Sequence, residues 1–284
     1  MLITSAITSL ANVLASLTHS SELPHRLNPP ASIPAPLEAM AWRCSGSTNA
    51  GLVSNLAGAG IIKSPRVRSA MGAVDRAHFC LHPSVAYEDS PQSIGYAATI
   101  SAPHMHAAAA ESLLPFLKPV PERGPEGGIA DADEVRVLDI GSGSGYLTAV
   151  FAEILGGAHA KGARVVGIDH IQGLVDMARA NMAKSASGRQ MLESGIVEFV
   201  LGDGRKGHPA AGPYDAIHVG AAAKEVHEEL LDQLKSPGRM FIPVEDPDGW
   251  GSQWIWVVDK DKDGRVKRRK DMGVRYVPLT DAPR

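Results

Sequence analysis

Three glycines and one acidic residue form the pattern in this sequence that is most typical of a binding site. Gly141, Gly143 and Gly145 follow a short apolar run at 135–140, and Asp169 ends the next such run. Glycines directly after a strand let backbone N–H groups approach a ligand closely, and an acid that ends the following strand can accept hydrogen bonds from ribose hydroxyls. The order therefore predicts a nucleoside-containing ligand. An alternative for Asp169 is that it caps the helix that follows.

The spacing of the glycines discriminates between nucleotide cofactors. The pattern is G-x-G-x-G, and Asp139 stands just before it, where its charge would repel a pyrophosphate. Asp139 could instead receive the cationic methionine end of S-adenosylmethionine. Asp203, which lies between Gly202 and Gly204 after a further apolar run, could reach an adenine amino group. Together these residues resemble the class I methyltransferase fold, which uses S-adenosylmethionine.

Strands and helices must alternate along the chain to position these residues. Helices are predicted where apolar residues recur every three or four positions, and the last of them carries Val226, Leu230 and Leu234 on one face. The predicted strands are 135–140, 164–168, 197–201, 216–219 and 240–244, and an antiparallel hairpin of 253–258 and 274–277 is expected to complete the sheet. Strands separated by single helices form right-handed βαβ units, so the predicted fold class is α/β, with a doubly wound, mostly parallel sheet.

Two helices and a long polar loop are predicted before the sheet. Ser64 followed by Pro65 is typical of a helix start, and a second helix is expected through 106–114. The stretch 87–96 between them is polar, contains Gly and Pro, and is too long for a simple turn. It is therefore predicted to be a functional loop.

Four stretches of the chain resemble the signatures of the protein-L-isoaspartate O-methyltransferase family. They read D-S-P-Q-S-I-G at 89–95, A-T-I-S-A-P-H-M-H at 98–106, D-A-I-H-V-G-A-A-A at 215–223 and Y-V-P-L-T-D at 276–281. The resemblance extends over about residues 40–281. It implies an enzyme that transfers a methyl group from S-adenosylmethionine to the free α-carboxylate of isoaspartyl residues in damaged proteins and peptides, which starts their repair.

The same resemblance implies roles for individual residues. Ser101 would contact the acceptor carboxylate and is the expected catalytic residue, with His106 lining the same region. Val219, Gly220 and Ala221 would also bind the acceptor. The residues expected to bind the cofactor are Ile94, Gly95, Tyr96, Ala97, Ser101, His106, Asp139, Ile140, Gly141, Ser142, Gly143, Asp169, His170, Gly202, Asp203 and Thr280.

The implied reaction agrees with the chemistry of a carboxylate acceptor and with the residues after the fourth predicted strand. A carboxylate has a pKa of about 4 and is ionised at neutral pH, so it needs alignment with the donor and no general base. The sequence there reads H-V-G-A at 218–221, whereas nitrogen methyltransferases typically carry N/D-P-P-Y/F. Two other functions stay open, a small-molecule methyltransferase on the same fold and a non-catalytic adenosylmethionine-binding adaptor. Ser101 could also be a helix N-cap, and His218 a hydrogen-bonded core histidine.

Composition and charge exclude several classes of partner. The 28 Lys and Arg against 31 Asp and Glu give a net charge of −3, so no general field attracts nucleic acid or an anionic membrane. The two cysteines cannot form a disulfide framework, and His104 and His106 cannot share a helix face, so no metal site is predicted. The basic run 267–270 stands among acids and is expected to be a solvated hairpin edge. We expect a cytoplasmic monomer.

The chain divides into four regions by composition. Residues 1–39 form an extension that is expected to be poorly ordered, because five prolines follow a broken apolar stretch. An import signal is the alternative, although the extension is not Arg-rich. Residues 40–118 would form the helical and acceptor-loop region, 119–133 a linker or insertion rich in Gly and Pro, and 134–284 the adenosylmethionine-binding core. Residues 40–284 are expected to be one structural domain.

Overall fold

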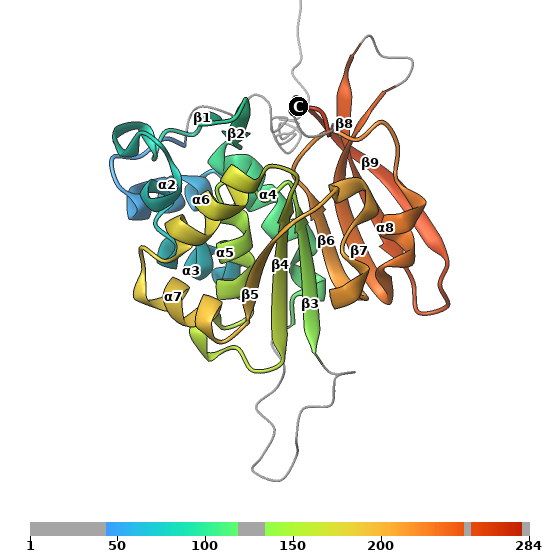
Figure 1. The fold of residues 1–284 in the computed structure, drawn as a ribbon. Coiled ribbons are helices and arrows are strands. Elements are labelled where there is room, and N and C mark those ends of the chain that lie inside the picture. Colours follow the sequence, from blue (N-terminus) through green and yellow to red (C-terminus); the bar gives the residue numbers. More distant parts are fainter. Residues whose placement is uncertain (1–43, 119–133, 247–250, 280–284) are drawn as a thin grey trace, which may run out of the picture. The chain divides into compact units, whose positions relative to one another are not determined.

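The computed structural model describes residues 44–118, 134–246 and 251–279 (Figure 1). The chain divides into two units, Met1–Ala35 and Pro36–Arg284, and every described residue belongs to the second. The predicted extension at 1–39 and the predicted insertion at 119–133 lie outside the described residues.

A seven-stranded sheet forms the centre of the described unit (Figure 1). Its spatial order is β5 (Val197–Leu201), β4 (Ala163–Asp169), β3 (Val135–Ile140), β6 (Tyr214–Val219), β7 (Leu234–Glu245), β8 (Gln253–Lys260) and β9 (Val266–Val274). Strands β5 to β7 run parallel, and β8 and β9 add antiparallel pairs. Because the chain order changes direction at β3, a crevice opens at the carboxyl ends of β3, β4 and β6, where such sheets bind ligands. The predicted fold class is confirmed.

Alternation along the parallel strands explains why they read as nearly continuous apolar runs. Val137 and Val165 belong to one buried cluster, whereas Leu138 and Val166 belong to a second cluster. Successive side chains of a strand point to opposite faces of a sheet, so each cluster fills one face. The sheet is therefore buried on both faces, which is characteristic of parallel strands.

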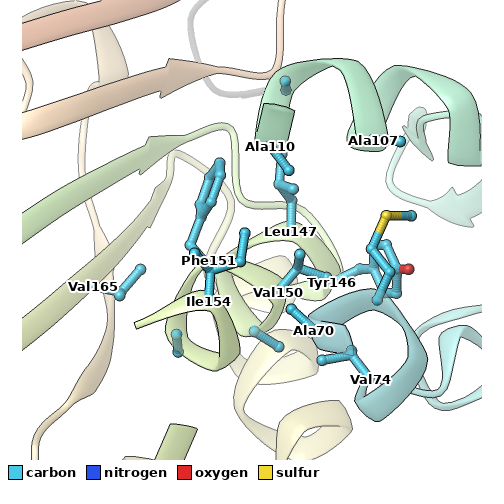
Figure 2. Packing of buried hydrophobic residues seen from close by; sticks show 14 of the residues in the cluster. Ala70, Val74, Ala107, Ala110, Tyr146, Leu147, Val150, Phe151, Ile154 and Val165 are labelled. Carbon is cyan, nitrogen blue, oxygen red and sulfur yellow. The ribbon is translucent and has the colours of Figure 1, made fainter. Parts of the chain in front are cut away.

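Most of the described helices pack on the first of these two faces. They are α2 (Asn49–Gly58), α3 (Pro65–Ala73), α4 (Pro103–Leu113), α5 (Tyr146–Ile154), α6 (Gln172–Met182) and α7 (Ala186–Glu193). Figure 2 shows α5 between the sheet and the outer helices, with Phe151 near Val165 and Val150 near Ala70. The short helix α8 (Glu228–Asp232) buries Leu230 and Leu231 in the cluster of the other face.

Three of the predicted elements are wrong in part. Leu234 is the first residue of β7, opposite Tyr214, because the helix before it ends at Asp232. The last strand is Val266–Val274, so the strand predicted at 274–277 overlaps it only at Val274. The backbone of Tyr276 bonds instead to the side chain of Gln253. The predicted loop at 87–96 ends in a strand, β1 (Gln92–Gly95), which pairs with β2 (Ala98–Ile100).

Candidate active site

The larger of two adjoining cavities lies at the carboxyl ends of β3 and β4 and has a volume of about 350 Å³. This is within the size range of small-molecule and cofactor sites. Its lining comes from the β1–β2 turn, the glycine turn after β3, the end of β4, and the segments that follow β6 and β9. The residues are Tyr96, Ala97, Ala98, Thr99, Ile140, Gly141, Gly143, Ile168, Asp169, His170, Ile171, Leu174, Gly204, Gly220, Ala221, Val277, Pro278 and Leu279.

Asp169 is held in the wall of this cavity by two backbone donors. Gly143 N donates to Asp169 Oδ2 at 3.0 Å and Ile171 N donates to Oδ1 at 3.1 Å. Burial raises the pKa of Asp169, and these two hydrogen bonds oppose the increase. Helix α6 begins at Gln172 with Ile171 as its N-cap, so the alternative that Asp169 caps this helix is wrong. The carboxylate is instead fixed between the glycine turn and the end of β4.

The glycine turn leaves space for a ligand because its backbone adopts conformations that other residues rarely use. Gly141 and Gly143 have φ values of +69° and +52°. A Cβ on Gly143 would lie 3.2 Å from Ile94 Cδ1, so the side chain of Ile94 packs closely against the turn. Glycine at Gly143 therefore serves both the left-handed backbone and the close contact.

The turn between β1 and β2 covers one side of the larger cavity. Tyr96 and Ala97 have φ values of +53° and +56°, and Gly95 pairs with Ala98 around them. A two-residue turn with both φ values positive normally carries Asn and Gly, so this turn is strained. The Tyr96 ring packs so closely on Gly173 of α6 that a Cβ there would lie 2.3 Å from Tyr96 Oη. This strained turn places the aromatic side chain of Tyr96 at the cavity.

The segment Val277–Leu279 forms the opposite part of the wall. Ala222 N donates to Val277 O at 2.8 Å, and Leu279 N donates to Ala222 O at 2.7 Å. These two bonds fix the segment to the chain just after β6. Thr280, which was expected to help bind the cofactor, lies outside the described residues.

The smaller cavity has a volume of about 30 Å³, enough for a water-sized group. Thr99, Gly141, Gly143 and Gly220 line both cavities, so the two adjoin. The polar residues that line the smaller one are Thr99, Ser101, His106, Asp139, Ser142, Ser144, Tyr146 and His218. Ser142 Oγ and Tyr146 Oη are buried without a hydrogen-bond partner in the described part of the chain. Because unpaired buried hydroxyls are costly, they indicate that a polar group binds here.

Asp139 is a buried carboxylate with both oxygens engaged. His218 Nδ1 bonds to Asp139 Oδ1 at 2.7 Å, and Thr148 Oγ1 donates to Oδ2 at 2.5 Å. Asp139 is 1% exposed and does not line the larger cavity. Asp139 therefore lines only the smaller cavity, and its role toward the cationic end of the cofactor stays a prediction. Its side chain orients His218, which is both a hydrogen-bonded core histidine and part of the smaller cavity's lining.

The family model for protein-L-isoaspartate (D-aspartate) O-methyltransferase matches residues 47–284 of the chain. The chain belongs to this family.

Relatives and solved structures agree with this membership. A protein-L-isoaspartate O-methyltransferase of Caenorhabditis elegans is 45% identical over 241 residues, which is 85% of this chain and 96% of that protein. Protein-L-isoaspartate O-methyltransferase 2 of Arabidopsis thaliana is 48% identical over 81% of this chain and 67% of its own length. A Plasmodium falciparum structure that is named for the same family and contains S-adenosyl-L-homocysteine has a TM-score of 0.71 at 29% identity. It covers 83% of this chain and 99% of its own.

These comparisons confirm the predicted family, reaction and cofactor. As a protein-L-isoaspartate O-methyltransferase, the chain is an enzyme that uses S-adenosylmethionine to methylate isoaspartyl residues in proteins and peptides. The two alternatives, a small-molecule methyltransferase and a non-catalytic adaptor, are not favoured.

Ser101 is not the N-cap of α4, because that position is Ala102, so the N-cap alternative for Ser101 is wrong.

Most of the residues predicted for the site of this methyltransferase line one of the two cavities. The predicted residues in the larger cavity are Tyr96, Ala97, Ile140, Gly141, Gly143, Asp169, His170, Gly220 and Ala221. Those in the smaller one are Ser101, His106, Asp139, Gly141, Ser142, Gly143 and Gly220.

Five predicted site residues line neither cavity: Ile94, Gly95, Val219, Gly202 and Asp203. Asp203 accepts hydrogen bonds from Arg205 Nε at 2.9 Å and Nη2 at 2.8 Å, and these bonds lower the pKa of its carboxyl. Its neighbour Gly204, at the start of the 3₁₀ helix Gly204–Lys206, lines the larger cavity instead. The carboxylate that was expected to reach an adenine amino group is thus paired with an adjacent cation.

Tyr146 lines the smaller cavity and Arg76 bonds to a residue of that cavity, but neither was predicted from the sequence. Tyr146 follows the glycine turn as the first residue of α5, and burial raises the pKa of its phenol to about 12. Arg76 is fully buried and bonds to the backbone of Ser101. Tyr146 could have been found from its place after the glycines, but no pattern marks Arg76.

Proposed function

We propose that the larger cavity binds S-adenosylmethionine and that the smaller cavity binds the α-carboxylate of the isoaspartyl acceptor. The observation that carries this assignment is the contact between the two cavities at Thr99 and at the glycine turn. The cofactor, when bound, supplies a methyl group on a positively charged sulfur. Residues of the chain then have to hold an oxygen of the acceptor in line with that methyl group.

The residues of the larger cavity fit this cofactor. Asp169, already oriented by Gly143 and Ile171, presents a carboxylate that can accept hydrogen bonds from two adjacent ribose hydroxyls. Ile168, Ile171 and Leu174 supply apolar surface for a flat base, while Tyr96 and Leu279 close the sides. The left-handed glycines let the cofactor approach the backbone after β3.

The smaller cavity offers neutral donors to an acceptor that is already ionised. Ser101 is the proposed catalytic residue, and its hydroxyl would hold one carboxylate oxygen while the other faces the methyl group. No general base is needed. The bonds from His218 and Thr148 to the two oxygens of Asp139 fix this carboxylate in the wall of the cavity. A cavity this small favours a carboxylate that is one methylene closer to the backbone than that of an aspartyl residue.

We also propose that the protein acts as a cytoplasmic monomer that binds neither nucleic acid nor membranes. The net charge of −3 supports this proposal. In the basic run, Arg268, Arg269 and Lys270 contact Glu228, Asp271 and Asp246 respectively, so much of its charge is locally balanced. No helix of the described residues is long and apolar enough to cross a membrane.

The substrate assignment is tested by methyl transfer to an isoaspartyl peptide and to the same peptide with a normal aspartyl residue. We expect methylation of the isoaspartyl peptide and little of its isomer, because only the former carries the carboxylate at the distance that the small cavity admits. Equal turnover of both peptides would overturn the assignment.

The role of Ser101 is tested separately by Ser101→Ala. We expect the rate with the isoaspartyl peptide to fall by about tenfold to a thousandfold, because the acceptor loses its orientation. Cofactor affinity, measured by calorimetry, should be largely unchanged. Ser194→Ala, at an exposed position after α7, is the matched control. An undiminished rate in Ser101→Ala would remove Ser101 from the mechanism and leave the substrate assignment standing.

A further inference from the structure

The side chain of Gln253, the first residue of β8, pairs with the backbone of the segment that follows β9. The backbone of Gln253 lies in register with Glu245 of β7 and Val274 of β9. Its side-chain Oε1 accepts a hydrogen bond from Tyr276 N at 2.5 Å, and its Nε2 donates to Tyr276 O at 3.1 Å. One side chain therefore satisfies both backbone groups of Tyr276.

The described residues offer Tyr276 no backbone partner across β8. If the antiparallel register of Gln253 with Val274 continued by two residues, Gly251 would lie opposite Tyr276. Gly251 precedes β8 and has a φ value of +81°, which is outside the extended region of a strand. A carboxamide has a C=O acceptor and N–H donors, as a peptide group has. The side chain of Gln253 thus takes the place of a strand for this one residue.

The wall segment Val277–Leu279 of the larger cavity follows directly after this contact. Val277 and Pro278 are exposed and Leu279 is half-buried, so burial contributes little to holding the segment in place. The backbone of Ala222 bonds to Val277 O and accepts from Leu279 N. The position of the wall therefore depends on two pairs of hydrogen bonds, one from Ala222 and one from Gln253 to the residue just before the segment.

We propose that Gln253 is a positioning residue for the cofactor, because its two bonds to Tyr276 hold Val277–Leu279 in place as a wall of the larger cavity. The inference rests on the proposed function of that cavity. Gln253 lines neither cavity and acts through the backbone of Tyr276. Without these bonds the cofactor would have to order the segment when it binds, and this ordering lowers affinity.

The substitution Gln253→Glu makes one of the two bonds depend on pH. An ionised carboxylate can still accept from Tyr276 N, but its second oxygen faces Tyr276 O, which is also an acceptor. A neutral carboxyl group carries an O–H that can donate to Tyr276 O as the amide does. The carbonyl oxygen favours the neutral form, so the pKa of the new carboxyl group should lie above its ordinary value of about 4.3.

Calorimetry with S-adenosylmethionine measures the effect as the ratio of the variant Kd to the wild-type Kd at the same pH. We expect this ratio to be about ten at pH 7.5 and about three or less at pH 5 for Gln253→Glu. The ratio removes the effect of pH on groups that both proteins share, such as Asp169. A negative charge near a positively charged sulfur would by itself strengthen binding, so a charge effect alone has the opposite sign.

Two further variants are the controls for this measurement. Gln253→Ala loses both bonds at every pH, so we expect a Kd ratio of about ten at pH 7.5 and at pH 5. Gln190→Glu adds the same charge at an exposed position of α7 and should bind the cofactor as the wild type does. A purely structural role of Gln253 predicts equal ratios for Gln253→Glu at the two pH values. That result, or wild-type affinity in Gln253→Ala, would overturn the proposal.

Hydrogen exchange tests the position of the wall without any ligand. In Gln253→Ala we expect the amides of Tyr276 and Leu279 to exchange at least about tenfold faster than in the wild type. The amide of Ala223, which donates to Pro243 O at 2.9 Å, should be unchanged and is the internal control. Wild-type protection of Leu279 in this variant would overturn the proposal, because the wall would then be held without Gln253.

The variant Asp169→Ala separates this proposal from the function on which it rests. If S-adenosylmethionine binds Asp169→Ala and Gln253→Glu as tightly as the wild type, the assignment of the larger cavity fails and the proposal fails with it. If Asp169→Ala binds the cofactor more weakly and Gln253→Glu does not, only the role of Gln253 fails.

Discussion

Asp169 accepts hydrogen bonds from two backbone N–H groups and also lines the larger cavity, so a structural role stands beside its proposed role in cofactor binding. In Asp169→Ala the cofactor loses its ribose acceptor, and we expect binding to weaken by about 1.5–3 kcal/mol for each hydrogen bond lost. The freed N–H groups of Gly143 and Ile171 should also lower the melting temperature. Calorimetry and thermal melts measure the two effects.

Asp176→Ala provides the control for this substitution. Asp176 lies on α6, its side chain is mostly exposed, and it does not line the cavity. We expect nearly normal cofactor affinity in this control. Normal affinity in a folded Asp169→Ala protein would show that Asp169 only supports the turn.

The buried, neutral ring of His106 should make stability depend on pH. The unfolded chain takes up a proton on this residue near pH 6.5, whereas burial and Arg76 lower the pKa of His106 in the folded state. The folded protein therefore loses stability as pH falls below about 6.5, and one such group contributes on the order of 1 kcal/mol between pH 7 and 5.5. Chemical denaturation at the two pH values should show a smaller decrease for His106→Gln than for the wild type. Equal decreases would contradict a neutral, buried His106.

At the residue scale, site residues could be predicted from the sequence where the strand directly before them in the chain also fixes their position. Gly141, Gly143 and Asp169 follow directly from the ends of two strands, and each lines the larger cavity. Arg76 was missed because its partners at Ala86, Ser101 and His106 belong to three other segments. Asp139 and Asp203 were recognised as acids, but their bonding partners could not be read from the spacing.

The turn formed by Tyr96 and Ala97 is strained and lowers the stability of the fold, but it forms part of the wall of the larger cavity. Left-handed backbone costs roughly 1–2 kcal/mol at each residue other than glycine. Replacing the pair by Asn and Gly should therefore raise the melting temperature and weaken cofactor binding, because the Tyr96 ring leaves the wall. Ala97→Gly alone should stabilise the protein and keep the affinity. If the double variant bound the cofactor as tightly as the wild type, Tyr96 would have no role in the site.

At the element scale, the bounds of a strand were predicted correctly where the strand is buried on both faces of the sheet. They were predicted wrongly at the exposed end of the sheet. The strand Val135–Ile140 has the predicted bounds, since a strand buried on both faces carries apolar residues at most of its positions. Residues 266–271 of β9 are exposed and mostly charged, so nothing in their hydropathy indicates a strand. Leu234 follows Leu230 by four positions and resembles a helical residue, although its place is fixed by pairing with Tyr214.

At the scale of the whole molecule, the described residues that line the two cavities all follow the first part of the chain in sequence. Cavity-lining residues begin at Tyr96, and the family match begins at residue 47. We expect that deleting residues 1–39 leaves the melting temperature and the methylation rate nearly unchanged. A large loss of either would contradict the prediction that residues 40–284 form a single domain and that residues 1–39 are an extension outside it. If a fluorescent fusion of the full chain enters an organelle while the truncated one stays in the cytosol, the extension is a targeting signal.

The basic strand at the end of the described sheet has a further consequence for an enzyme whose acceptors are polypeptides. A damaged chain in extended form carries free N–H and C=O groups, which pair readily with any uncovered strand. Strand β9 presents Lys267, Arg268, Arg269 and Lys270 in succession, and charged side chains discourage such pairing. This charged edge therefore disfavours strand pairing between the enzyme and an extended acceptor chain.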